Sequence, residues 1–211
     1  MSSYTMISCL PLWEDFFFMQ QSLSLNPEQQ IAVEHTEGPM LVLAGAGSGK
    51  TRIVTHRILH LLEIGTPASE ILAVTFTNKA AEEMRQRIMQ MAKLQILTCT
   101  FHSLCAKILR ESIQYLGYTN HFIILDEEDS EKALKECLAK CGIKDEKSLL
   151  KSIRAQIQQA KNFLQEPECF CKENPTFFEI YSSYEKKLKE YNALDFDDLL
   201  FLTVKLFQTH P

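Results

Sequence analysis

The glycine-rich segment at residues 44–51, AGAGSGKT, limits the possible folds of this chain more than any other feature. Consecutive small residues let backbone N–H groups turn inward on phosphate oxygens, a lysine reaches the outer phosphates, and a following helix adds its positive end. An apolar run at 40–44 precedes the segment, and residues 51–64 carry apolar side chains at helical spacing until Gly65. We therefore expect a strand, a phosphate-binding loop and a helix.

Each role in such a loop has a residue here. The glycines that permit close approach of the backbone are Gly45, Gly47 and Gly49. Lys50 supplies the positive charge, and the Thr51 hydroxyl is placed to ligate Mg²⁺. Ala44 replaces the first glycine of the pattern, which the loop tolerates if its φ is negative. The alternative is a turn without a ligand, and the motif alone leaves open kinases, transporters and GTPases.

Strand-like and helix-like segments alternate after this loop. The strand-like runs lie at 71–76 and 96–100. Between them, one helical face carries Ala81, Met84 and Ile88. A second helix is expected through Leu104, Ile108 and Leu116. Strands that alternate with helices indicate a parallel sheet.

After a short apolar run at 122–125 the pattern changes to helices only. Ser130 is placed to cap the first of them, which carries Ala133, Leu134 and Leu138 on its apolar face. A composition shift near residue 112 indicates a second subdomain. We expect four parts: an N-terminal extension at 1–24, the first part of a nucleotide-binding subdomain at 25–111, a helical accessory subdomain at 112–191 and a return segment at 192–211.

Composition narrows the class of protein without naming a ligand. The 211 residues are 45% apolar and 23% charged, with a formal net charge of -5, so any nucleic-acid binding must come from a local patch. Seven cysteines, an odd and unevenly spaced set, favour free thiols in a reducing compartment. No basic leader and no run of eighteen apolar residues occur, so we expect a cytoplasmic protein with no membrane partner.

Four further segments occur in a fixed order: LNPEQQIAV at 25–33, TFTNKAAEEMRQRI at 75–88, TFHSLCAKILR at 100–110 and NALDFDDLL at 192–200. With the glycine loop, they resemble the UvrD/Rep type of superfamily 1A DNA helicases, over nearly everything from residue 25 onward. The resemblance implies an α/β fold, the RecA-like parallel sheet of a P-loop NTPase, incomplete in this chain and interrupted by a helical inserted subdomain. It also implies ATP and Mg²⁺ as cofactors.

The family's adenine-selecting glutamine falls on Gln29. A glutamine amide can donate to N7 of adenine and accept from its N6 amino group. The alternative is a solvated polar residue at the start of a helix after Pro27. The full set of candidate ATP-binding residues is Gln29, Ala44, Gly45, Ala46, Gly47, Ser48, Gly49, Lys50, Thr51 and Arg52, of which Lys50 and Thr51 are the candidate catalytic residues.

In the family, the TFTN and TFHS segments touch single-stranded DNA at the carboxyl ends of two strands. The candidate DNA-binding residues are Phe76, Thr77, Asn78, Thr100, His102 and Ser103. From sequence alone Phe76 is equally a core aromatic and Asn78 a helix cap, and a lone histidine is usually structural. Basic residues surround these segments, at Lys79, Arg85, Lys107 and Arg110. A solvated helix face is the alternative for each of them.

Hydrolysis of ATP needs an acidic pair after an apolar strand. Asp126 and Glu127 have that form, but the resemblance places them at the entry to the helical subdomain, and we expect no catalytic role for them. The family's own acidic motif is expected beyond residue 211. Residues 195, 197 and 198 are expected to begin or cap a helix rather than bind metal. The pairs Cys137/Cys141 and Cys169/Cys171 do not match zinc or iron–sulfur spacings.

The resemblance implies the amino-terminal part of an ATP-driven 3'–5' DNA helicase or translocase. Its expected partners are single-stranded DNA, duplex junctions and repair or replication proteins. Since the acidic motif and the second motor domain of the family are not in the sequence, we expect the isolated chain to be inactive in hydrolysis. Two alternatives remain at this stage, a module that binds ATP, DNA or a partner without hydrolysis, and an unrelated P-loop kinase or GTPase.

Overall fold

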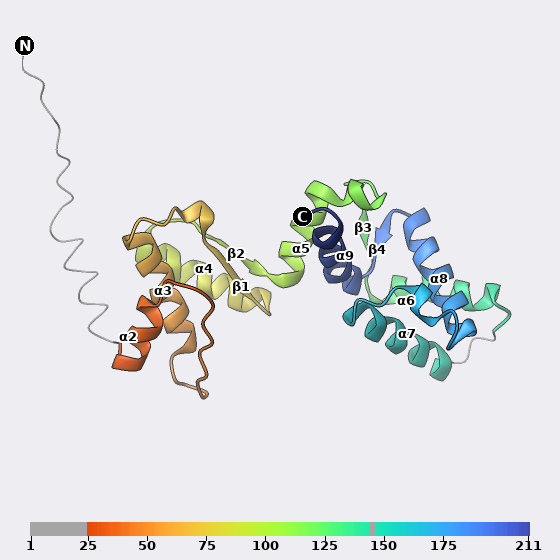
Figure 1. The fold of residues 1–211 in the computed structure, drawn as a ribbon, viewed down its shortest axis with the longest axis horizontal. Coiled ribbons are helices and arrows are strands. Elements are labelled where there is room, and N and C mark those ends of the chain that lie inside the picture. The colour runs from red at the N-terminus through yellow and green to blue at the C-terminus, as the bar shows by residue number, and fades with distance from the viewer. Residues whose placement is uncertain (1–24, 144–146) are drawn as a thin grey trace, which may run out of the picture. The chain divides into compact units, whose positions relative to one another are not determined.

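The computed structural model describes residues 25–143 and 147–211 and divides them into two compact units (Figure 1). The first unit extends to Cys99 and the second runs from Thr100 to Pro211. Each unit is described by itself below. The predicted extension at 1–24 lies outside the described residues.

The first unit alternates helices and strands. Its elements are α2 (Pro27–Glu34), α3 (Lys50–Glu63), the 3₁₀ turn η1 (Ala68–Glu70), β1 (Leu72–Thr75), α4 (Asn78–Ala92) and β2 (Leu97–Thr100). Helix α2 begins with a capping box, in which the Asn26 side chain accepts from the Gln29 N–H and the Gln29 side chain accepts from the Asn26 N–H. β1 and β2 are neighbours in a two-stranded sheet and are joined through α4.

The core of this unit lies between α3, β1 and α4. Ile58 on α3, Ala73 on β1 and Met84 and Ile88 on α4 are buried in one cluster. The apolar face predicted at 81, 84 and 88 is therefore confirmed, because all three side chains are buried. A smaller cluster of Ala32, Val33 and Ile53 packs α2 against α3, so the residues around the glycine loop are fixed by only a few apolar contacts.

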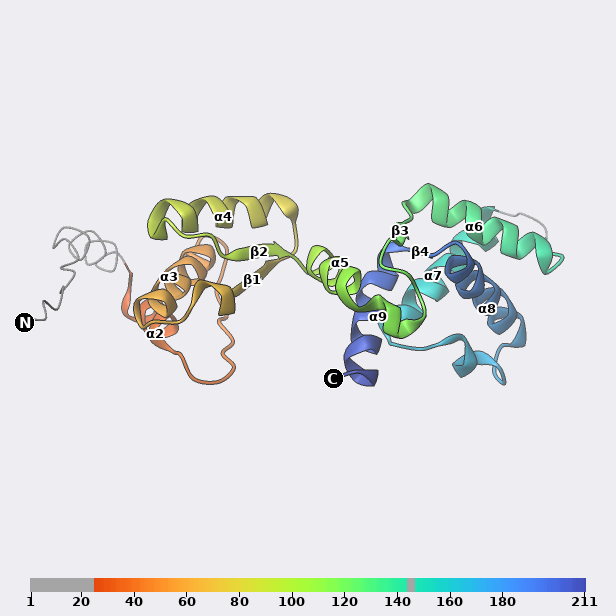
Figure 2. The same ribbon diagram turned by 90° about the horizontal axis from the view of Figure 1, so that it is seen from above.

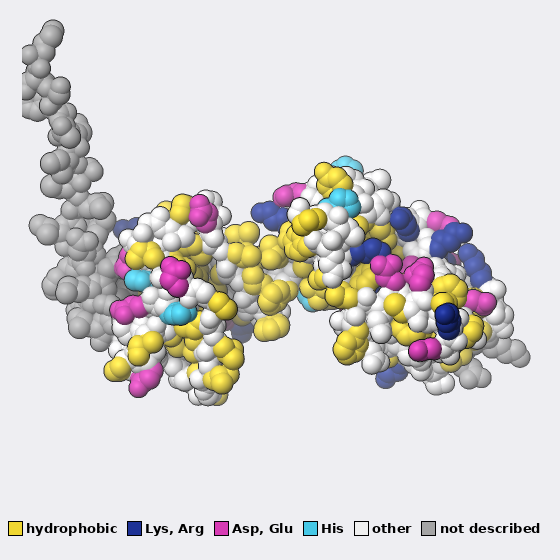
Figure 3. Space-filling view, viewed as in Figure 1, with side chains coloured by type: hydrophobic (Ala, Val, Ile, Leu, Met, Phe, Trp, Pro, Cys, Tyr) yellow, Lys and Arg dark blue, Asp and Glu magenta, His cyan; other side chains and the backbone are white. Residues whose placement is uncertain are grey.

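The strand expected at 40–44 is not formed, and that prediction was wrong for the described residues. Leu41 and Leu43 are 81% and 85% exposed. Figure 3 shows hydrophobic side chains at the surface of this unit. A strand exists only where a neighbouring backbone supplies hydrogen bonds, and no segment within 25–143 or 147–211 pairs with these residues.

The second unit is mostly helical. Its elements are α5 (Phe101–Ser112), η2 (Ile113–Leu116), β3 (Ile123–Ile124), α6 (Glu127–Lys140), α7 (Lys147–Asn162), η3 (Pro167–Phe170), α8 (Pro175–Glu190), β4 (Ala193–Leu194) and α9 (Phe196–Thr209). β3 and β4 pair in parallel, with Ile123 opposite Ala193 and Ile124 opposite Leu194. Helices α6, α7 and α8 are therefore an excursion between two neighbouring strands (Figure 2).

Two apolar clusters fill this unit. One packs α6, α7 and α8 around the fully buried Cys137 and Tyr181, which agrees with the expected core role of Cys137. The other packs α5 against α9 around Leu109, Phe122 and Leu199. The last helix of the unit, α9, thus packs against its first helix, α5.

Two local expectations in this unit were wrong. The helix predicted through Leu116 ends at Ser112, and a 3₁₀ turn with Gly117 at φ 78° follows. Ser130 does not cap α6. Instead the Asp126 side chain accepts from the Asp129 N–H one turn earlier, and Ser130 lies inside the helix.

In the described part of the chain, no helix has the length and apolar character needed to cross a membrane.

Candidate functional site

The glycine loop turns directly into helix α3. Gly47 and Gly49 adopt left-handed φ angles of 77° and 84°, which strain any residue that carries a Cβ. Ala44 is not among the described residues with positive φ, as its substitution for glycine requires. A Cβ added at Gly45 or Gly47 would meet no atom within 4 Å, so the face of the loop is open to an incoming group.

Lys50 lies over this loop. Its Nζ donates to the carbonyl oxygens of Ala44, at 2.9 Å, and Gly45, at 2.6 Å. Lys50 is also the first residue of α3, and the first N–H groups of a helix have no partner within it. The Ile53 N–H is the first to close a helical turn, on the Gly49 carbonyl. An ammonium beside the positive end of a helix forms an environment suited to phosphate oxygens.

Gln29 reaches the same loop from α2. Its Nε2 donates to the Ser48 carbonyl oxygen at 3.0 Å, while its Oε1 accepts from the Asn26 N–H at 3.1 Å. The structure thus brings together two regions 19 residues apart that the sequence analysis assigned to one nucleotide site. Gly49 lies close to this contact, since a Cβ there would lie 3.0 Å from Gln29 Nε2.

The predicted TFTN segment lies where β1 ends. Phe76 is 89% exposed, so it is not the core aromatic that the sequence left open. The helix cap is Thr77, whose hydroxyl accepts from the Ala80 N–H at 3.1 Å, and Asn78 is the first residue of α4. The cap holds the exposed ring at the junction of strand and helix.

The predicted TFHS segment lies at the start of α5. Thr100 caps the helix by accepting from the Ser103 N–H at 3.2 Å, and the two hydroxyl oxygens lie 2.8 Å apart. His102 stacks on Phe196 of α9, with ring centroids 3.9 Å apart and ring planes 18° apart. Partial burial lowers the pKa of His102 below 6.5, although the carboxylate of Asp197 opposes the shift. The ring is therefore kept mainly neutral.

Two of the basic residues near these segments have structural partners. Arg85 pairs with Glu82 and donates to the Thr98 carbonyl oxygen at 2.7 Å, which fastens α4 to β2. Arg110 donates to the Phe122 carbonyl oxygen at 2.5 Å, and its guanidinium lies 3.7 Å from the centre of the Phe122 ring. These contacts favour the structural interpretation of both arginines.

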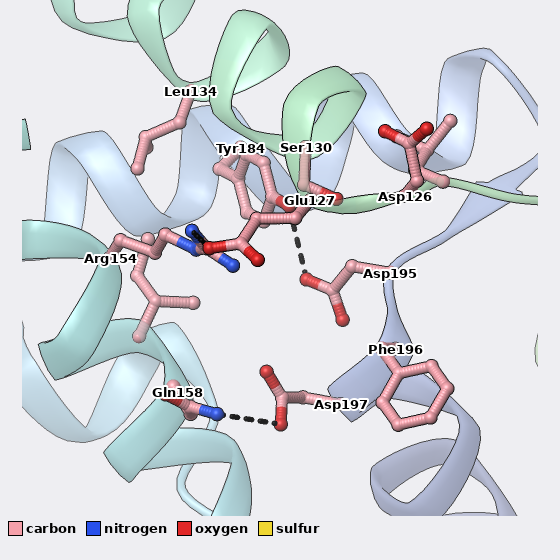
Figure 4. Close-up of a pocket in the computed structure, with 12 residues that line it drawn as sticks. Asp126, Glu127, Ser130, Leu134, Arg154, Gln158, Tyr184, Asp195, Phe196 and Asp197 are labelled. Atoms are coloured by element: carbon pink, nitrogen blue, oxygen red, sulfur yellow. Dashed lines mark hydrogen bonds and ion pairs between the residues drawn. The ribbon is translucent and has the colours of Figure 1, made fainter. Parts of the chain in front are cut away.

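The acidic pair at 126–127 also has structural partners. Asp126 caps α6, and Glu127 lies 2.5 Å from Arg154 of α7. Both carboxylates line a cavity of about 260 Å³ between α6, α7 and the start of α9 (Figure 4). Among the described residues, no group of three His, Cys, Asp or Glu side chains is arranged to hold a metal ion.

A buried ionic cluster lies at the first turn of α9. Lys161 of α7 is fully buried, and its Nζ lies 2.8 Å from Asp195, 2.6 Å from Asp198 and 2.9 Å from Glu185. Asp195 and Asp198 also form a capping box, each accepting from the backbone N–H of the other. Tyr184 donates to Asp195 Oδ2 at 3.1 Å. The expectation that residues 195–198 begin a helix is confirmed.

Burial and the neighbouring charges shift the pKa values of the residues in this cluster. Burial disfavours the ammonium of Lys161, but the three carboxylates outweigh it and hold its pKa well above the usual value. Burial raises the pKa of Asp198 well above its usual value. For Asp195 burial is outweighed by Lys161, so its pKa is lowered. Asp195 accepts from Lys161, Tyr184 and the Asp198 N–H, and these donors favour its ionised form.

Comparison with known proteins decides the family. The sequence profile of the UvrD/REP helicase N-terminal domain matches residues 25–211. The chain belongs to this family.

Curated relatives of this UvrD/REP helicase domain carry the name ATP-dependent DNA helicase PcrA. The protein from Bacillus subtilis (strain 168) is 43% identical over 205 residues, which cover 92% of this chain and 28% of the relative. The protein from Staphylococcus aureus (strain Mu50 / ATCC 700699) is 40% identical over 196 residues, covering 89% and 27%. The chain therefore spans just over a quarter of the length of these relatives.

Two residues of this UvrD/REP helicase domain were missed by the sequence analysis. Phe196 lies in the DFDD segment that was recognised, but its partner His102 is 94 residues away. Lys161 carried no signal in the sequence, since a single lysine in an amphipathic helix usually lies on the solvated face. The spacing along α7 could have indicated that Lys161 is buried, because it follows Ile153 and Ile157 at helical spacing on the buried side.

Proposed function

We propose that this chain is the amino-terminal part of an ATP-dependent 3'–5' DNA helicase, and that it binds Mg-ATP at residues 44–52 and single-stranded DNA through the TFTN and TFHS segments. The observation that carries the nucleotide part is the contact of Gln29 with the loop that Lys50 caps. This contact supports the proposal that Gln29 reads the base of a nucleotide whose phosphates the loop binds. Family membership and the PcrA relatives support the DNA part.

Different groups of the loop and of α3 would hold different parts of Mg-ATP. Lys50 would exchange its two carbonyl partners for phosphate oxygens, which are better acceptors for an ammonium because they are charged. The N–H groups at the start of α3 would donate to oxygens of the same phosphates, and the Thr51 hydroxyl would hold Mg²⁺. When bound, Mg-ATP supplies the phosphoanhydride bond whose hydrolysis drives translocation in the full-length protein.

Gln29 retains capacity to select adenine. Its amide group has two N–H donors and an oxygen with two lone pairs, and the structure uses one of each. The remaining donor and acceptor match the N7 and N6 positions of adenine. The contacts to Asn26 and Ser48 hold the amide in place, which reduces the entropy lost when a base binds.

On the DNA side, Phe76 offers an exposed ring for base stacking, and the exposed Thr77, Asn78 and Ser103 offer groups for phosphate contacts. Thr100 is only 7% exposed, and its hydroxyl supports this surface by capping α5 beside Ser103. The neutral His102 ring is suited to stacking or to a single hydrogen bond. The full-length protein would act on duplex junctions in repair or replication. A cytoplasmic location follows from that role as a prediction.

Calorimetric titration of the chain with Mg-ATP tests the nucleotide part. Lys50→Ala should weaken binding by about tenfold or more, since it removes charge-assisted hydrogen bonds. Gln29→Ala should reduce the preference for ATP over GTP. Gln30→Ala is its matched control, because Gln30 lies on the same helix and its side-chain amide donates to Glu34 of that helix. A wild-type chain that prefers GTP would reject the adenine assignment and support an unrelated GTPase.

Fluorescence anisotropy with a labelled deoxythymidine oligonucleotide tests the DNA part. Phe76→Ala should weaken binding by about tenfold, the loss of one stacked base. Phe163→Ala is the control, because Phe163 is also well exposed, at 69%, and lies outside both DNA segments. Equal effects of the two substitutions would mean that the oligonucleotide binds non-specifically.

A second function applies to the chain by itself, as a module that binds ATP and DNA without hydrolysis. The structural partners of Asp126 and Glu127 favour it, since Asp126 serves as the cap of α6 and Glu127 as the ion-pair partner of Arg154. Phosphate release with and without single-stranded DNA decides between the two. Turnover that DNA stimulates and Lys50→Ala abolishes would reject the module.

A further inference from the structure

The buried cluster at Lys161 does more than neutralise charge, because of what it holds. Its two aspartates, Asp195 and Asp198, are the capping box of α9, and Lys161 bonds to both. Without a cation between them, two carboxylates that share a buried turn would repel each other. Lys161 therefore fixes the first turn of α9 from its buried side.

The two residues between the aspartates are less buried than the aspartates themselves. Phe196 is 57% exposed, and Asp197 lies at the wall of the cavity, where Gln158 donates to it at 3.4 Å (Figure 4). Gln158 and Lys161 are one turn apart on α7, so this helix contacts the first turn of α9 twice. The turn that carries Phe196 is thus held by α7 on both sides of this residue.

Phe196 contacts α5 through its ring, which stacks on His102. His102 is the second residue of α5, two positions after the Thr100 cap that begins the helix. The described groups that act on its charge are the carboxylate of Asp197 and the burial of its own ring. A continuous path of contacts therefore joins Lys161, the capping box, Phe196 and His102.

We propose that Lys161 is a positioning residue for the TFHS segment: by holding the Asp195–Asp198 capping box it fixes Phe196, and Phe196 fixes the His102 ring. The contribution to DNA binding rests on the proposed function. The positioning itself does not, because it concerns only contacts within the second unit. The lysine is suited to this task since one ammonium can bond to several carboxylates at once.

The test uses the 211-residue chain and three variants. Lys161→Met removes the charge at similar length, and Lys161→Met with Asp198→Asn also removes one of the facing carboxylates while keeping a side chain that can cap. Lys151→Met is the control, since Lys151 is on the same helix and exposed. The two readouts are the pKa of His102 from an NMR titration and the affinity for a deoxythymidine oligonucleotide.

We expect Lys161→Met to move the pKa of His102 up toward its ordinary value and to weaken oligonucleotide binding about fivefold, a size typical of coupling between neighbouring sites. The double variant should recover much of both, and Lys151→Met should change neither. If Lys161→Met proves unfolded, Lys161→Gln, which keeps a polar side chain without the charge, replaces it with the same expected results. An unchanged His102 pKa in a folded Lys161→Met variant would falsify the positioning role. A shifted pKa with no oligonucleotide binding, even by wild type, would support positioning and reject the proposed DNA function.

Discussion

Lys50 and Lys161 are the same residue in opposite surroundings. Lys50 is exposed and bonds to two carbonyl oxygens of its own loop, whereas Lys161 is fully buried among three carboxylates. The first can exchange its partners for a ligand at little structural cost. The second cannot, since its loss leaves buried charge without compensation. Burial therefore distinguishes the two lysines: the exposed Lys50 can change its hydrogen-bond partners, whereas the buried Lys161 holds the residues around it in place.

The largest expected effect is on stability at Lys161. Lys161→Met should lower the free energy of unfolding of the second unit by about 3–5 kcal/mol, because it breaks a buried ion pair on one side. Lys50→Met should change stability by less than about 0.5 kcal/mol, as exposed substitutions usually do. Urea unfolding followed by circular dichroism, with amide hydrogen exchange in α7 and α9, measures both. Equal losses for the two variants would contradict the comparison.

The next effect concerns the rigidity of the loop itself. Gly49→Ala should destabilise the first unit by about 1–3 kcal/mol, since it places a Cβ at a left-handed residue and against Gln29. Gly45→Ala should leave stability unchanged or raise it by up to about 1 kcal/mol, because its Cβ meets open space. Thermal unfolding compares them. Should Gly45→Ala be the more damaging, the loop is held differently from this description.

A smaller effect separates capping from catalysis at Asp126. Asp126→Ala should cost about 1 kcal/mol through the lost helix cap. Asparagine caps nearly as well as aspartate, so Asp126→Asn should stay within about 0.5 kcal/mol of wild type. Thermal melts test the cap. If the chain hydrolysed ATP and Asp126→Asn abolished that hydrolysis, the acidic pair would be catalytic after all.

The smallest effect is the titration of His102. Its pKa should lie below 6.5, and Phe196→Ala should raise it by exposing the ring. With this lowered pKa, the folded wild type binds fewer protons than its unfolded state. The stabilisation from burial of the neutral His102 ring is therefore present above about pH 6.5 and is lost as the pH falls toward the folded pKa. An NMR titration of wild type and variant measures the shift directly. A wild-type value above 6.5 would show that Asp197 dominates.

The sequence alone led to the glycine loop, the link of Gln29 to it, and the helices with clear apolar faces. These features are local, or belong to motifs in a known order. Positions 81, 84 and 88 were predictable because helical spacing places them on one face whatever lies opposite. The choice between Asp126 and Ser130 as a cap was not, since both are good caps and only the exit from β3 decides where the helix begins.

What the tertiary structure decided involves partners far apart in the chain. The apolar run at 40–44 reads as a strand, but it remains single because strands need a neighbour and none within the described residues pairs with it. Lys161 and Asp195 are 34 residues apart, and His102 meets Phe196 across a longer separation. Periodicity records which face of an element is apolar, whereas charge pairs and ring stacks depend on which elements pack together. The loop at 44–51 was therefore recognised from its residues, while Lys161 became visible only in the fold.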